Sequence, residues 1–185
     1  MNITERAEAQ LEITMKWRRE AWEVGGMRDT PPMIGWLTEG RSEYDHAPWP
    51  VVRDLYQQAG DDSASVVYSV IKHVAAEPDF TRLREIIFVT ESYGFKDEEL
   101  PPESLELDFK TNPSSKVVEQ ITVIIVADDL VGGAEAAVAM QPYRISDGGQ
   151  MVFGEPEVAG PGEVSAVDSQ IVEAMKWGVL HAHET

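Results

Sequence analysis

The chain has 185 residues, 43% of them hydrophobic, and no cysteine, which excludes disulfides, thiolate catalysis and cysteine-based zinc sites. A formal net charge of −18 disfavours direct binding to nucleic acid or to an anionic membrane, because affinity for phosphate comes mainly from lysine and arginine. The charge either keeps the protein soluble or presents an acidic surface to a basic partner.

The sequence shows no targeting or membrane-spanning segment. No stretch approaches the roughly 18 apolar residues that a membrane helix requires. Charges at Glu5, Arg6 and Glu8 occupy the place where a signal peptide has its apolar region. We therefore expect a soluble, cytoplasmic protein with no membrane partner.

The first predicted element is an amphipathic helix of about twenty residues. Asn2 and Glu5 have the spacing of a capping box, and Gly25 and Gly26 can end the helix. Trp17 lies off the main apolar stripe, so it either widens the buried face or marks a contact. The stripe consists of Ile3, Ala7, Leu11, Met15 and Trp22.

The segment from Thr30 to Pro50 contains four prolines and is predicted to be a long loop. It carries more apolar mass than a solvated linker holds. It therefore either folds over the core or forms a lid or partner-binding loop, since tryptophan and tyrosine are common interface anchors. The candidate partner-binding residues are Met33, Trp36, Leu37, Tyr44 and Trp49.

Two further helices are predicted before the sheet begins. The first starts at Pro50 and is closed by Gly60. The second is capped by Asp61 or Asp62 and buries valine and isoleucine, and a strand is the alternative for Ser65 to Val74.

From Arg84 onward the apolar pattern changes to that of strands. Ile86 to Phe95 begins buried and ends polar, and Leu105 to Phe109 alternates as a half-exposed strand does. Ile121 to Ala127 has one polar side chain in seven, which predicts a central strand covered on both faces.

The C-terminal part completes the expected domain. Ala134 to Met140 forms either a strand or a short helix, Tyr143 to Ile145 pairs with Met151 to Phe153 as a hairpin, and Val164 to His181 forms a second amphipathic helix.

These elements predict a single α+β domain over residues 1–185, with a helical half at about 1–80 and the sheet with its terminal helix at about 84–182. The N-terminal helices pack with a mainly antiparallel sheet of four or five strands, and the C-terminal helix closes it.

Carboxylates near strand ends are the candidate metal ligands. Glu91 lies late in one strand, and Asp128 and Asp129 follow another. Oxygen ligands of this kind bind hard divalent cations such as magnesium or manganese. The alternative is that the aspartates form turns by bonding local amides. No other cofactor is indicated.

The histidines offer weaker candidates. His181 and His183 would share a metal ion only in an extended tail, and a frayed C-terminus is the alternative. His46, beside Asp45, could act as a general base oriented by a carboxylate.

The sequence lacks phosphate-loop, dinucleotide, zinc-protease, serine-hydrolase and EF-hand motifs. The first hypothesis is therefore a non-enzymatic acidic interaction protein, an inhibitor or adaptor that binds a basic, nucleic-acid-binding protein. The alternatives are a metal-dependent hydrolase or phosphotransfer enzyme using Glu91, Asp128 and Asp129, and a structural homo-oligomer subunit.

Overall fold

A computed structural model describes residues 1–25, 31–60, 62–77, 83–95, 117–127, 134–146 and 148–183. Within these ranges the chain forms a seven-stranded sheet in which all the pairings are antiparallel. The strand order is β2-β1-β3-β4-β5-β6, and β7 also pairs with β5. The strands are β1 (Met33–Thr38), β2 (Asp45–His46), β3 (Leu83–Phe95), β4 (Val117–Ala127), β5 (Glu135–Ile145), β6 (Met151–Phe153) and β7 (Glu157–Ala159).

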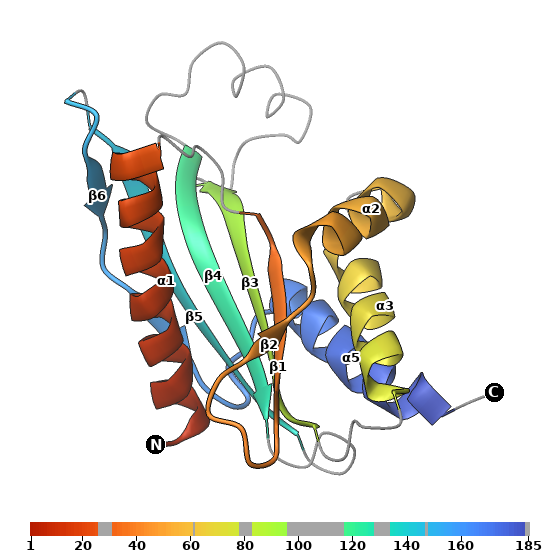
Figure 1. Cartoon of the computed structure of the whole chain (residues 1–185). Helices are drawn as coiled ribbons and strands as arrows, with labels where there is room; N and C mark the ends of the chain where they lie inside the picture. The colour runs from red at the N-terminus through yellow and green to blue at the C-terminus, as the bar shows by residue number, and fades with distance from the viewer. Residues whose placement is uncertain are drawn as a thin grey trace.

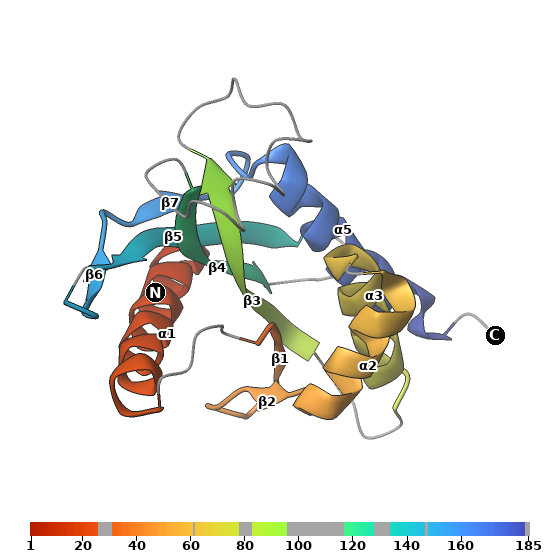
Figure 2. The same cartoon turned by 90° about the horizontal axis from the view of Figure 1, so that it is seen from above.

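Helices cover both faces of the sheet (Figure 1). One face carries α1 alone, and the opposite face carries α2, α3 and α5, an arrangement that is also clear from above (Figure 2). None of the helices in the described ranges has the length and apolar content that crossing a bilayer requires. The helices are α1 (Ile3–Gly25), α2 (Trp49–Ala59), α3 (Ser63–Ala75), α5 (Ala166–Leu180) and the 3₁₀ turn η1 (His181–His183).

The predicted helix boundaries follow from local capping. The Asn2 amide donates to Glu5 Oε2 at 2.8 Å and the Glu5 amide donates to Asn2 Oδ1 at 2.9 Å, so the capping box is confirmed. Gly60 ends α2 with a left-handed φ of 63°, and Asp62 accepts from the Ala64 amide at 3.1 Å to start α3. The helix prediction is therefore confirmed over Ser65 to Val74, and the strand alternative is wrong.

Residues 121–127 of the central strand β4 are buried on both faces, as predicted. Ile124 and Val126 belong to the core cluster under α3 and α5, while Val123 and Ile125 belong to the cluster under α1. Each of these side chains is at most 1% exposed. Burying a valine or isoleucine contributes about 1.5 to 3 kcal/mol. Because β4 contributes such side chains to both clusters, it connects the two halves of the core.

The sheet differs from expectation in its number of strands. The structure has more strands than the four or five predicted, because β1 and β2 lie inside the segment Thr30 to Pro50, which was expected to be a loop. The prolines of that segment flank these strands rather than interrupt them, and β1 pairs with β3 over Met33 to Thr38.

Three further predictions of the C-terminal half are confirmed. The segment Ala134 to Met140 falls largely within β5 and not in a helix, and Tyr143 pairs with Phe153 in the expected hairpin. The terminal helix α5 begins at Ala166, where the Ser165 hydroxyl accepts from the Asp168 amide at 3.1 Å. The predicted α+β fold with helices at both ends is confirmed, and the strand expected at Leu105 to Phe109 lies outside the described residues.

Candidate functional site

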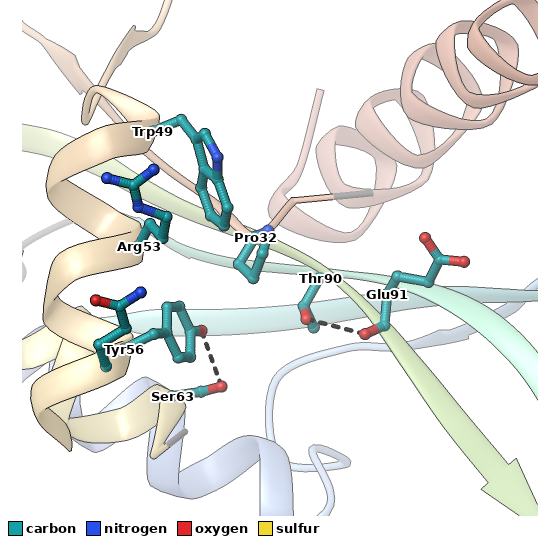
Figure 3. A pocket seen from close by; sticks show the side chains of 8 residues that line it. Pro32, Trp49, Arg53, Tyr56, Ser63, Thr90 and Glu91 are labelled. Carbon is teal, nitrogen blue, oxygen red and sulfur yellow. Dashed lines mark hydrogen bonds between the residues drawn. The ribbon is translucent and has the colours of Figure 1, made fainter. Parts of the chain in front are cut away.

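A cleft opens between α2 and the part of β3 that extends beyond its pairing with β1 (Figure 3). The last pair of these two strands is Met33 with Val89, so Thr90 and Glu91 continue past the start of β1. The cleft has a volume of about 560 Å³, within the range of small-molecule sites. Its lining residues are Pro32, Trp49, Arg53, Tyr56, Gln57, Ser63, Thr90 and Glu91.

One side of the cleft is formed by one face of α2. Trp49, Arg53 and Tyr56 follow each other at i, i+4 and i+7, the spacing that places side chains on one side of a helix. The Tyr56 hydroxyl donates to Ser63 Oγ at 2.9 Å and so connects α2 with the first residue of α3. Trp49 is 43% exposed, so one wall of the cleft is an aromatic ring accessible to solvent.

Charge in the cleft comes from Arg53 and not from a carboxylate. The carboxylate of Glu91 points away from the other labelled side chains in Figure 3 and pairs with Arg18 of α1 at 3.5 Å. The Arg53 guanidinium contacts Asp54 at 3.0 Å, but both side chains are more than half exposed, so this surface pair is weak.

Of the three residues predicted as metal ligands, Glu91 lies in the described part of the chain, where it pairs with Arg18 of α1. Asp128 and Asp129 lie outside the described residues, so the metal site stays a prediction. Within the described ranges, no group of three or more histidines, aspartates or glutamates is arranged to hold a metal ion.

A second polar cluster lies on the α1 face, at the opposite end of β3. Arg6 Nε contacts Glu85 Oε2 at 3.3 Å, and the Tyr44 hydroxyl donates to Glu85 Oε1. His46 lies beside the Tyr44 ring, with ring centroids 6.4 Å apart. Partial burial of the imidazole lowers the pKa of His46 from 6.5, and the Asp45 charge opposes that shift in part. This cluster was not predicted, because its members come from three separate segments.

The five predicted partner-binding residues are distributed over different surroundings. Met33 and Tyr44 pack against the core cluster under α1, and Trp36 packs against the opposite cluster. Leu37 is half-buried and Trp49 lines the cleft. The structure therefore does not bring these side chains to one surface.

The C-terminus also differs from expectation. The Tyr68 hydroxyl lies 3.1 Å from His181 Nδ1, and the Trp177 ring lies 5.0 Å from the His181 ring. The frayed terminus that was considered is therefore wrong at His181, because these aromatic contacts hold it against α3 and α5.

The outward flank of α1 exposes a stripe of large apolar side chains. Ile13 is 60% exposed, Trp17 44% and Val24 90%. Trp17 was the one signal of this surface in the sequence, because it lies off the stripe that packs on the sheet.

Comparison of the chain with known protein families, with curated proteins and with solved structures finds no match.

Proposed function

We propose that the chain is a non-enzymatic acidic interaction protein that binds a basic protein segment along the outward flank of α1. The observation that carries this proposal is the exposure of Ile13, Trp17 and Val24 in one stripe of an otherwise polar helix surface. Contiguous exposed apolar side chains with a polar rim are typical of binding surfaces, and tryptophan is a common anchor.

The three side chains share one direction around the helix axis. At about 100° per residue, Ile13, Trp17 and Val24 lie within about 40° of one another. Arg6 has the same direction and contacts Glu85 of β3, which places the stripe on the flank of α1 that faces β3. A helix or extended segment can therefore lie alongside α1 in contact with all three.

The balance of exposed charges on α1 favours a basic partner. Outward-facing Lys16 and Arg19 are outnumbered by exposed glutamates, and the other two arginines of α1, Arg6 and Arg18, pair with Glu85 and Glu91. Electrostatic complementarity of this kind increases the association rate and excludes acidic partners. The exposed glutamates are Glu5, Glu8, Glu12, Glu20 and Glu23.

A basic amphipathic helix fits this surface best. Leucine-type side chains at i, i+4 and i+11 would match the spacing of Ile13, Trp17 and Val24, while lysines of the partner would be attracted by the negative charge of α1. A second copy of the chain fits less well, because each copy carries a net charge of −18.

The test is binding of a labelled helical peptide of leucine and lysine, measured by fluorescence anisotropy. We expect the double variant Ile13→Ala and Trp17→Ala to weaken binding at least tenfold while the far-UV circular dichroism is unchanged. Raising the salt concentration from 50 to 300 mM should weaken binding to the unaltered protein.

The matched control is Trp177→Ala, which removes a tryptophan of similar exposure, 48%, from the opposite side of the sheet. This variant should bind the peptide as the unaltered protein does. Equal losses in both variants, or equal binding of a peptide with glutamine in place of lysine, would overturn the proposal. Dimers that disappear in the double variant would instead assign the stripe to a second copy.

A further inference from the structure

We infer that the cleft between α2 and β3 is a separate binding site for a small molecule that combines a planar aromatic ring with an anionic group. It lies on the side of the sheet opposite α1, and its lining involves none of the residues in the exposed stripe of α1. The inference therefore stands or fails independently of partner binding by α1.

The flat side chains that line the cleft indicate that the ligand contains an aromatic ring. Trp49 and Tyr56 project from one face of α2, and Pro32 lies across from them (Figure 3). Flat aromatic and prolyl surfaces of this kind enclose a planar ring by stacking and edge contacts. With a volume of about 560 Å³, the cleft can hold one or two fused rings with a short side arm.

The positive charge of Arg53 in the lining indicates that the ligand carries an anionic group. Arg53 is the cation at the rim, and the one carboxylate in the lining, that of Glu91, pairs with Arg18 of α1 instead of facing the cleft. A guanidinium binds carboxylate or phosphate with two parallel hydrogen bonds and also stacks on aromatic rings. Displacing the weak, exposed contact of Arg53 with Asp54 costs little.

The net charge of the chain does not prevent anion binding here. Exposed charges more than about 8 Å away are largely screened at physiological ionic strength, whereas a direct contact with Arg53 is not. The Thr90 hydroxyl donates to the Glu91 carbonyl at 3.3 Å and, like Gln57, lies in the lining. The cleft therefore offers one cation with neutral polar groups around it, in a protein with 33 acidic residues.

The test is isothermal titration calorimetry with matched acidic and neutral probes. Indole-3-acetate is compared with indole-3-acetamide, and adenosine monophosphate with adenosine. We expect at least one acidic probe to bind at least tenfold more tightly than its neutral partner. The arm that binds distinguishes a carboxylate ligand from a phosphate ligand.

The variants assign the binding to the cleft. Arg53→Gln should remove the preference for the acidic probe, and Trp49→Ala should weaken both members of the pair about tenfold. Arg41→Gln is the matched control, because it removes one exposed arginine from the turn after β1, at the other end of that strand from Pro32. Absence of binding by both acids at millimolar concentration, equal affinity for acid and neutral probes, or unchanged binding in Arg53→Gln would overturn the inference.

Discussion

Arg18 of α1 and Glu91 of β3 form an ion pair, with 3.5 Å between Nε and Oε2 and only 1% and 5% of the side chains exposed. Arg18 also donates to the Tyr143 hydroxyl at 3.3 Å. A second pair, Arg6 with Glu85, lies twelve helix residues and six strand residues away. These separations correspond to about 18 Å and about 20 Å, so the two pairs hold α1 parallel to β3 in one position.

Replacing Arg18 should be strongly destabilising, because Glu91 would keep a buried charge without its cation. We expect Arg18→Met to lower the free energy of unfolding by about 3 kcal/mol, measured by urea denaturation. Arg53→Gln removes an exposed partner of Asp54 and should change it by less than about 0.5 kcal/mol.

The double variant Arg18→Met and Glu91→Leu separates charge from packing. Because an apolar pair of similar size replaces both charges, it should recover most of the stability that Arg18→Met loses. If the double variant is as unstable as the sum of the two single changes, the pair is not the source of the effect.

The two tryptophans of the segment predicted as a loop should behave differently. Trp36 packs against the core cluster under α2 and α3, while Trp49 is 43% exposed at the cleft. We expect Trp36→Ala to lower the unfolding free energy by about 3 kcal/mol and Trp49→Ala to change it by less than about 0.5 kcal/mol. Similar losses in both variants would show that Trp49 is part of the core.

Local signals in the sequence were sufficient for most of the fold. The Asn2–Glu5 capping box and the closing Gly60 depend on neighbours within four residues, and the burial of β4 is visible in its unbroken apolar run. The strand β1 was missed because Pro31 and Pro32 dominated the interpretation of its surroundings, while its pairing with β3 is a contact across about fifty residues.

The candidate site was harder to predict, because its residues come from separate segments of the chain. Thr90 and Glu91 continue past the last pair of β3 with β1, Met33 with Val89, and line the cleft together with side chains of α2. The contact of Arg18 with Glu91 joins residues 73 positions apart and has no local signal. Spacing along the chain could not reveal either relationship.

Gly178 of α5 should not tolerate a methyl group. A Cβ at this position would lie 3.0 Å from Ile71 and 3.1 Å from the Tyr68 carbonyl oxygen of α3. Alanine favours a helix by about 1 kcal/mol, but the clash between packed helices outweighs that gain. We expect Gly178→Ala to lower the thermal midpoint by about 2 to 4 °C. Gly25→Ala, where no atom lies within 4 Å, should leave it unchanged within error.

The stability of the protein should depend on the protonation of His46. Burial lowers its pKa below 6.5, so the unfolded chain binds this proton more readily than the native protein does. The contribution of neutral His46 is complete above pH 6.5 and decreases as the pH falls toward the native pKa. Between pH 7.5 and 5.5 the unaltered protein should therefore lose more stability than His46→Asn, as measured by urea denaturation at each pH.

The neighbours of His46 determine the size of this effect. Asp45 raises the pKa of His46 in part, so Asp45→Asn should lower that pKa further and increase the loss of stability on acidification. Tyr44, whose hydroxyl binds Glu85, lies beside the imidazole of His46. Gly35 has no side chain and so leaves the space that the His46 ring occupies. Titration of the His46 ring by nuclear magnetic resonance should give a midpoint below 6.5. A midpoint above that value, or parallel stability profiles for the unaltered protein and His46→Asn, would contradict the assignment of burial as the cause.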